Sequence, residues 1–146
     1  MPYFTYDTSV IISRRPRNLR PGRSWFLSSI VLMELMASAV DDAQRKGYEQ
    51  LYREHQQNES LIVPNDADWI LAGKILFWLT QRRRKVEGGR LRRLHAGRSQ
   101  RMALDALLAA SARRHQATIV TENWNDFKAI QRFCNVQVIK ASDFFS

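Results

Sequence analysis

The chain has 146 residues, of which 45% are hydrophobic and 10% aromatic, so it is long enough to fold as one domain and is not disordered throughout. Its 23 Lys and Arg residues outnumber its 14 Asp and Glu residues, giving a formal net charge of +9. Such an excess favours a polyanionic partner such as nucleic acid; a solvated basic surface and contact with an acidic protein are the alternatives.

Several classes are disfavoured by missing motifs. The sequence has no P-loop, no G-x-G-x-x-G and no G-x-S-x-G, which argues against an NTPase, a dinucleotide-binding enzyme or a serine hydrolase. It has no Cys and His spacing typical of zinc sites. The single cysteine, Cys134, cannot form an internal disulfide, and neither a signal peptide nor a membrane span is evident. We therefore expect a cytoplasmic protein that makes no membrane contact.

In chain order, short apolar segments alternate with helical ones. Residues 2–6 predict a strand, 14–23 a basic loop, 25–27 a second strand and 30–46 a helix. The polar segment 48–57 is interpreted as a helix that continues past Gly47. Residues 61–63 predict a strand or an extended connector, and 64–85 a helix that ends in a basic run.

The second half of the sequence repeats this alternation. Gly88 and Gly89 interrupt the chain, and a second basic stretch then leads to a helix over residues 102–115. A strand at 118–121, a short helix at 125–132 and a last strand at 136–139 complete the prediction. The alternation predicts one α/β domain over residues 1–146 with a mostly parallel sheet.

Four acidic residues stand in apolar surroundings. Asp7 ends the first strand, and Asp126 follows the strand 118–121 by five residues. Glu34 and Asp105 lie on helix faces whose neighbours three and four residues away are almost all apolar. Buried carboxylates are rare unless they are paired or bind a cation, and ligands of parallel sheets bind beyond the strands' carboxyl ends. We therefore expect these acids to form a cluster that binds Mg²⁺ or Mn²⁺.

Two basic segments lie between the acidic residues in the sequence. They are the loop 14–23 and the region 82–101, and they supply the candidate RNA contacts Arg14, Arg15, Arg17, Arg83 and Arg92. A metal-binding acidic centre within a basic surround suggests hydrolysis of phosphodiester bonds better than either feature alone.

Each of these residues also has a purely structural interpretation. A lone Asp after a strand, such as Asp7, is more often a turn or cap residue, and Glu34 has a less favoured alternative as the partner of an arginine in a buried ion pair. Thr8 and Ser9 either cap the turn after Asp7 or hydrogen-bond a carboxylate or water, and capping is slightly favoured. The tryptophans are expected in the core, although Trp124 lies beside the expected site and is a candidate for base stacking.

Four segments together resemble the PIN-domain family, and within it the VapC-type toxins of bacterial toxin–antitoxin pairs. They are 6–12 (YDTSVII), 27–35 (LSSIVLMEL), 104–112 (LDALLAASA) and 119–127 (IVTENWNDF), and their order and spacing fit the family along nearly the whole chain. The chain differs from the family in its short, arginine-rich segment between Asp7 and Glu34 and in its long basic stretch at 82–101.

The resemblance implies a three-layer α/β/α fold and an Mg²⁺- or Mn²⁺-dependent endoribonuclease with Asp7, Glu34, Asp105 and Asp126 as its acidic set. It implies that Asp7, Asp105 and Asp126 bind the metal, and that Thr8, Thr121 and Asn123 support the site. It further implies a homodimer inhibited by a cognate antitoxin whose tail covers the acids. Two alternatives remain: a catalytically inactive nucleic-acid-binding module of this fold, and a structural module whose acids pair with arginines.

Overall fold

The protein is described here from a computed structural model, and the description covers residues 3–86 and 96–146, without the side chains of residues 84, 86 and 96–98. Its strands are β1 (Tyr3–Tyr6), β2 (Leu27–Ser28), β3 (Leu61–Ile62), β4 (Ala117–Thr121) and β5 (Val138–Lys140). β1 pairs with β4 and β4 with β5, while β2 pairs with β3, and all these pairs are parallel.

A single parallel bridge between Phe4 and Trp25 joins the two groups of strands. The amide of Phe26 donates to the Phe4 carbonyl oxygen over 2.9 Å, and the amide of Leu27 donates to the Ser60 carbonyl oxygen over the same distance. The strands therefore lie side by side in the order β3-β2-β1-β4-β5. The direction of chain progression reverses between β1 and β4, so the crevice at the carboxyl ends of these two strands is where a parallel sheet places its ligands.

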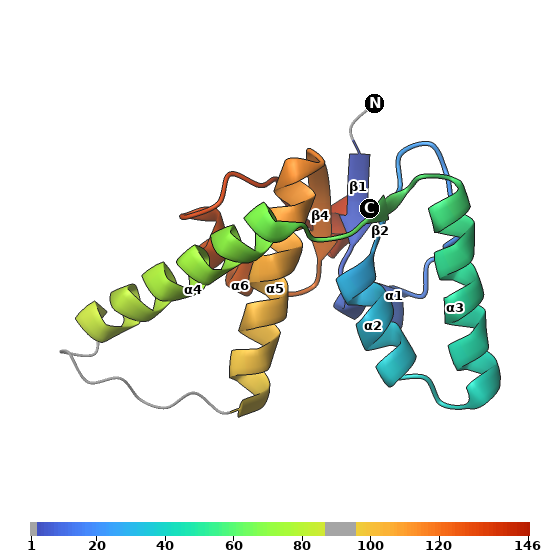
Figure 1. Ribbon diagram of the computed structural model, residues 1–146, viewed down its shortest axis with the longest axis horizontal. Helices are drawn as coiled ribbons and strands as arrows, with labels where there is room; N and C mark the ends of the chain where they lie inside the picture. The colour runs from blue at the N-terminus through green and yellow to red at the C-terminus, as the bar shows by residue number, and fades with distance from the viewer. Residues whose placement is uncertain (1–2, 87–95) are drawn as a thin grey trace.

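Helices flank the strands on both sides, as the three-layer prediction requires (Figure 1). α2 (Ser29–Ala37) packs against α3 (Asp42–Gln57) on one side, and α4 (Asp66–Val86) packs against α5 (Ala96–Arg114) on the other. The remaining helices are shorter: α1 (Thr8–Arg14), α6 (Trp124–Gln131) and α7 (Ala141–Phe144). The predicted α/β fold with a parallel sheet is confirmed.

The core forms where α5 meets the central strands. Ile119 and Val120 of β4 are fully buried, as are Ala106, Ala109 and Ala112 of α5. Small alanine side chains let the helix approach the sheet closely, which a larger residue at these positions would prevent. The close approach sets the depth at which Asp105 stands relative to the strand ends.

The structure contains a short helix, α1, that the sequence analysis did not predict. It lies directly before the basic loop and includes Arg14, the first residue of the predicted 14–23 segment. Asp7 caps α1 by accepting from the Val10 amide over 3.1 Å, while Val10 and Ile11 are buried. The helix ends where Arg15 adopts a left-handed conformation (φ 45°), directly before Pro16. The sequence prediction missed α1 because its single buried turn is too short to show helical periodicity.

The helix predicted over residues 30–46 is wrong in its extent, because α2 ends at Ala37 and α3 begins at Asp42. Asp41 accepts from the Gln44 amide over 2.8 Å, and the Gln44 side chain accepts from the Val40 amide over 2.9 Å. This reciprocal pair starts a new helix. α3 then runs through Gly47 as expected.

Other boundaries move by a few residues. α5 begins at Ala96 instead of 102, the last strand lies at Val138–Lys140, and α7 follows it. Within the described residues, no helix is both long enough and apolar enough to cross a membrane.

Candidate active site

Asp7 lies at the carboxyl end of β1, where the strand order reverses, and only 4% of its surface is exposed. Its amide donates to the Val120 carbonyl oxygen over 3.1 Å, which ties it to β4. One carboxylate oxygen, Oδ1, accepts from the Ser9 hydroxyl over 2.5 Å and from the Val10 amide over 3.1 Å. The position of this carboxylate is therefore fixed by both the sheet and the first turn of α1.

Thr121 ends the neighbouring strand β4 and is buried. Its hydroxyl donates to Oδ2 of Asp7 and accepts from the Asn123 amide over 2.8 Å. Thr121 thus links the carboxylate at the end of β1 to the turn that leads into α6. Of the three predicted supporting residues, the structure places Thr121, through its hydroxyl, and Asn123, through its backbone amide, in this network.

Glu34 projects from α2 and is half-buried. Its Oε1 accepts from the Thr8 hydroxyl over 3.0 Å, and within the described part of the chain it forms no ion pair with an arginine. Burial raises the pKa of Glu34, the Thr8 hydrogen bond lowers it, and the charge of Asp7 raises it again. The ion-pair alternative for Glu34 therefore has no support in this structure.

Thr8 and Ser9 do not cap the helix themselves, contrary to the favoured prediction. Asp7 is the cap, and each of the two hydroxyls donates to a carboxylate of the site instead. The reason is geometric, because the first turn of α1 points consecutive side chains toward Glu34 on one side and back toward Asp7 on the other.

Asp105 lies on α5, and the charges of the other three acids all affect its pKa. Its pKa is raised to about 8, first by burial and then by the charges of Asp7, Asp126 and Glu34. Arg101, one helical turn earlier, opposes the shift. The fold therefore brings all four predicted acids, which span residues 7 to 126, within electrostatic reach of one another.

Asp126 occupies the first turn of α6 and is exposed to solvent. Burial also raises the pKa of Asp7, which its hydrogen bonds with Ser9, Thr121 and Val10 lower and the charge of Glu122 raises. The acids of the site therefore range from Asp7, which is almost fully buried at the end of β1, to Asp126, which is exposed to solvent.

The donor chemistry suits Mg²⁺ or Mn²⁺, because the side chains offer carboxylate and hydroxyl oxygens. The spacing is looser than a complete cage: among the residues described, no three His, Cys, Asp or Glu side chains form a metal-ligand group. Hydroxyl and amide donors occupy both oxygens of Asp7 and one of Glu34. Mg²⁺ commonly keeps several waters and uses one or two carboxylates directly, so these residues fit the ion with partial direct ligation.

The arginines predicted to bind RNA differ in their exposure and in the contacts they make. Arg14 forms an ion pair with Glu122 over 2.6 Å and lies 5.7 Å from the centre of the Phe145 ring. Arg15 and Arg17 are exposed, and Arg83 is partly buried on α4. Arg92 lies outside the described residues.

Sequence reasoning did not single out Arg101 or Glu122 as part of the site, and it gave hydrogen bonding to a carboxylate only as the second interpretation of Ser9. Ser9 holds Asp7, and its Oγ accepts from the Glu122 amide over 3.3 Å. Arg101 acts on Asp105, and its position four residues earlier on a helix was a readable signal. No sequence pattern could have linked Glu122 to Arg14, which is 108 residues away.

Trp124, the candidate for base stacking, has two cationic neighbours. Lys128 and Lys140 lie 5.7 Å and 5.4 Å from the centre of the Trp124 ring, so this ring packs against two cations. Asp143 is exposed on α7, and its charge is not among those that shift the pKa of Asp105.

A parallel α/β sheet with acidic residues gathered at its switch point defines a class of proteins that bind cations and polar ligands at this edge. The PIN domain family matches residues 5–132, and the chain belongs to this family. PIN domains are in general nucleases that use divalent metal ions.

Solved structures with the same fold come from VapBC complexes. DNA-bound VapBC from Salmonella typhimurium aligns with a TM-score of 0.56 at 19% identity, covering 97% of this chain and 99% of that one. VapBC-5 from Mycobacterium tuberculosis, a member of the VapBC family of toxin–antitoxin systems, aligns with a TM-score of 0.55 at 19% identity, covering 96% and 99%. VapBC-1 from nontypeable Haemophilus influenzae gives 0.52 at 21% identity, covering 96% and 98%. No curated protein matches the chain.

Proposed function

We propose that this protein is a metal-dependent endoribonuclease that cleaves RNA phosphodiester bonds and serves as the toxin of a toxin–antitoxin pair. The observation that carries the proposal is the arrangement of acids at the switch point of the sheet: Thr121, at the end of β4, donates to Asp7, at the end of β1, and the adjacent Thr8 donates to Glu34. In accord with this arrangement, the charges of Asp7, Glu34 and Asp126 raise the pKa of Asp105. When bound, Mg²⁺ or Mn²⁺ supplies the Lewis acidity that phosphodiester hydrolysis requires.

The chain's own residues have separate tasks in this proposal. Asp7, Asp105 and Asp126 would hold the ion, directly or through water. Asp7 is aimed by Thr121 and Ser9, which are themselves fixed by hydrogen bonds to the Asn123 and Glu122 amides. These hydroxyls act as positioning groups.

Glu34 is suited to hold the attacking water. Its Oε1 accepts from Thr8, which leaves Oε2 to accept a proton from that water. Burial raises the pKa of Glu34, so its affinity for a proton exceeds that of an ordinary glutamate. Asp105, with a pKa of about 8, needs a neighbouring cation to be ionised at neutral pH.

The test is cleavage of a mixed tRNA and mRNA pool by the purified protein with Mg²⁺, with Mn²⁺ and with EDTA. Asp7→Asn is the informative variant, because asparagine caps a helix as well as aspartate does, removes the charge and replaces the oxygen that accepts from Thr121 with an NH2 group. Asp143→Asn, at an exposed position away from the site, is the matched control.

We expect discrete, metal-dependent products from wild type and Asp143→Asn, and a loss of at least about 100-fold in Asp7→Asn. Cleavage by Asp7→Asn at the wild-type rate would refute the assignment. RNA binding without cleavage or metal uptake would instead favour the inactive binding module, the alternative that the loose spacing of the acids keeps open.

The antitoxin and the homodimer are further parts of the proposal, supported by the VapBC complexes that share the fold. A pocket of about 440 Å³ opens beside Glu34 between α2 and α5, with Met33, Ala37 and Leu104 as apolar walls and Arg101 at its edge. Such a pocket suits an apolar antitoxin segment. Met33→Glu should abolish inhibition by the co-expressed antitoxin while cleavage continues; equal inhibition of the variant would exclude this contact. Sedimentation of the free protein tests the dimer.

A further inference from the structure

A small pocket between α4 and α6 is lined by cations. Its volume is about 240 Å³, and its polar lining consists of Arg82, Lys128 and Arg132 with Asn125. Asn125, Lys128 and Arg132 recur at helical spacing, so they share one face of α6, while Phe127 and Ile130 of the same helix are buried. None of the described residues that line this pocket carries a carboxylate.

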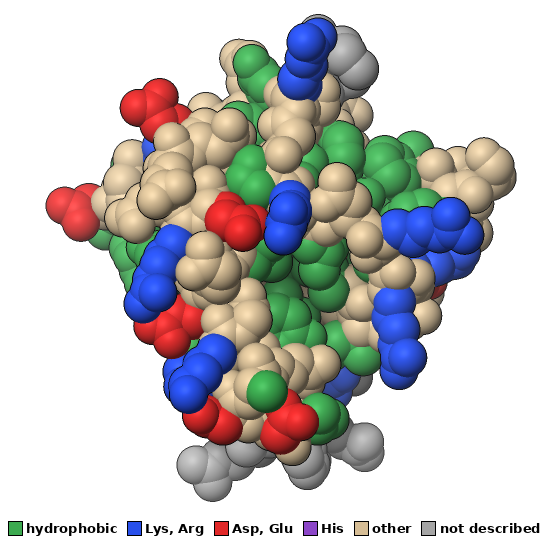
Figure 2. Space-filling view, turned by 90° about the vertical axis from the view of Figure 1, so that its right-hand side faces the viewer, with side chains coloured by type: hydrophobic (Ala, Val, Ile, Leu, Met, Phe, Trp, Pro, Cys, Tyr) green, Lys and Arg blue, Asp and Glu red, His purple; other side chains and the backbone are tan. Residues whose placement is uncertain are grey.

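The cations of this pocket differ from those on α3. On α3, Arg45, Lys46 and Arg53 form ion pairs with acidic residues of the same helix. Figure 2, which faces the side of the molecule where α3 lies, shows basic and acidic side chains next to one another. In the part of the chain that the structure describes, Arg82, Lys128 and Arg132 form no ion pair. Like charges that face one pocket repel each other, and an anion relieves that repulsion.

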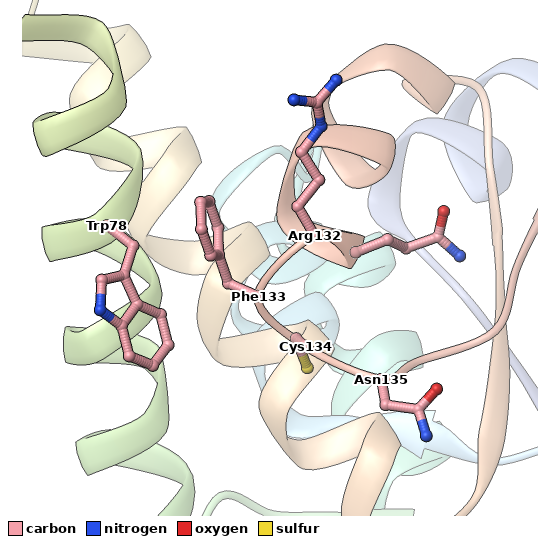
Figure 3. A pocket seen from close by; sticks show the side chains of 6 residues that line it. Trp78, Arg132, Phe133, Cys134 and Asn135 are labelled. Carbon is pink, nitrogen blue, oxygen red and sulfur yellow. The ribbon is translucent and has the colours of Figure 1, made fainter. Parts of the chain in front are cut away.

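An aromatic pocket of about 440 Å³ adjoins the cationic one and shares Arg132 with it. Figure 3 shows Trp78 projecting from α4 toward Phe133, with Arg132 pointing away from the two rings and Asn135 on the other side. The ring centres of Trp78 and Phe133 are 5.6 Å apart, and 37% of Trp78 is exposed. The pair therefore offers an open aromatic surface beside the cations, and Asn135 offers an exposed amide.

The two pockets share α4 with each other, and the cationic pocket shares α6 with the acidic site. Arg82 is four residues after Trp78 on α4, so both pockets follow one face of that helix. On α6, Asn125 lines the cationic pocket and the next residue, Asp126, acts on Asp105. A strand that crosses both pockets would thus arrive at the acids from the α6 side.

We propose that the α4–α6 surface is a binding site for single-stranded RNA, with a phosphate held by Arg82, Lys128 and Arg132 and a base stacked on Trp78 and Phe133. The combination of cations that track the backbone with an aromatic platform is how single strands are bound without strict sequence preference. This inference rests on the proposed function, because it supplies the substrate path for the same acidic site.

The experiment measures binding of a fluorescein-labelled 12-nucleotide single-stranded RNA by anisotropy in EDTA, at several salt concentrations. One variant is Lys128→Gln/Arg132→Gln, whose residues are exposed; its matched control is Lys46→Gln/Arg53→Gln on α3. We expect the pocket variant to weaken binding at least about 10-fold and to reduce the salt slope by about 0.7, the value for one lost phosphate contact on a single strand. The control should stay within about 2-fold of wild type. Equal losses in both double variants would overturn the proposal.

The aromatic part is tested with Trp78→Leu, and its control Trp69→Leu lies on the opposite face of α4 at a more exposed position. We expect Trp78→Leu to weaken binding about 10-fold, Trp78→Phe to restore most of it, and Trp69→Leu to have no effect. If Trp78→Leu instead changed the sedimentation of the protein and left RNA affinity intact, the pocket would be a protein contact and the stacking role would be wrong.

The two proposals fail separately. Loss of binding in the pocket variants of a protein that does not cleave RNA would uphold this surface and refute the nuclease. Metal-dependent cleavage by wild type, with pocket variants that bind as wild type does, would uphold the nuclease and refute this surface.

Discussion

Asp7 has two roles: it caps α1, and its carboxylate belongs to the acidic site. Thr121 is the residue that makes this combination stable, because its hydroxyl hydrogen-bonds a carboxylate that is almost wholly buried. A hydrogen bond to a charged group contributes about 1.5–3 kcal/mol, more than one between neutral groups.

Replacing Thr121 with valine should therefore lower the free energy of unfolding by about 2 kcal/mol. The reason is that Oδ2 of Asp7 loses its donor, which also moves the pKa of Asp7 further upward. Urea unfolding measures the change. Thr118→Val, on the same strand and half-buried, is the control and should change stability by less than about 0.5 kcal/mol. Equal effects of the two substitutions would show that the hydrogen bond contributes nothing.

His55 organises a second buried network, remote from the acids. Its Nδ1 meets the Ser60 hydroxyl over 2.7 Å, its Nε2 meets the Leu19 carbonyl oxygen over 2.8 Å, and the same carbonyl oxygen accepts from Trp25 Nε1 over 2.9 Å. This network ties the arginine-rich loop to α3. Burial lowers the pKa of His55, so the folded protein favours the neutral imidazole.

The stability of the protein should consequently depend on pH below about 6.5. The unfolded chain binds a proton at His55 more readily than the folded chain does, so the contribution of His55 to the free energy of unfolding falls as pH drops through that range, by at most about 1.4 kcal/mol per pH unit. His115 contributes in the same direction, whereas the raised pKa of Asp105 acts in the opposite one. In unfolding between pH 7 and 5, the difference in stability between His55→Gln and wild type should therefore shift in favour of the variant as pH falls, and a difference that is the same at both pH values would show that His55 does not contribute.

At the scale of elements, helix ends are held by side chains more than by helical propensity. Asn65 and Asp68 cap α4 reciprocally, with amide-to-side-chain distances of 3.0 Å and 2.9 Å. Arg114, at the end of α5, donates to the same Asp68 carboxylate over 2.9 Å and to the Val63 carbonyl oxygen over 2.8 Å. The start of α4 and the end of α5 are thereby locked together.

Arg114→Ala should remove that lock and leave the Asp68 carboxylate, only 3% exposed, without its charged partner. We expect a loss of about 2–3 kcal/mol in denaturant unfolding, because a buried charge keeps its desolvation cost when its partner is removed. Arg113→Ala, at the adjacent exposed position, should lie within about 0.5 kcal/mol of wild type. A similar loss in both would point to helix propensity instead of the ion pair.

At the scale of the whole molecule, the acidic site makes the stability of the protein depend on pH. Asp105 has a folded pKa of about 8 and an ordinary value of 3.8, so the folded protein retains its proton where the unfolded chain has lost it. The stabilisation from this group is complete below about pH 4 and is lost as pH rises toward 8.

Divalent ions should therefore stabilise the protein most in mildly alkaline solution. We expect the thermal midpoint in EDTA to fall between pH 7 and 8.5 and Mg²⁺ to restore it, by about 2.7 kcal/mol at a hundredfold excess over its Kd. Differential scanning calorimetry of wild type and Asp105→Asn makes the comparison. The variant should lose both the pH dependence and most of the Mg²⁺ effect; an unaltered Mg²⁺ effect would place the ion elsewhere.

The fold class and the acidic residues of the site could be predicted from the sequence. The alternation of apolar strands and helices gave the α/β class, and acids on apolar faces marked Asp7, Glu34, Asp105 and Asp126, because period and burial are properties of neighbouring residues. The break between α2 and α3 and the helix α1 were missed because capping by Asp41 and Asp7 depends on a few local hydrogen bonds that outweigh the hydrophobic pattern.

Long-range contacts were decided by the tertiary structure alone. The pairing of β1 with β4 brings Thr121 to Asp7 across 114 residues, and the packing of α5 against β4 sets Asp105 beneath both. The α4–α6 surface likewise joins Trp78 to Arg132, which no sequence period connects. Periodicity tells which side of an element faces inward, but only the packed sheet determines which elements meet there, because those contacts depend on strand order and helix placement together.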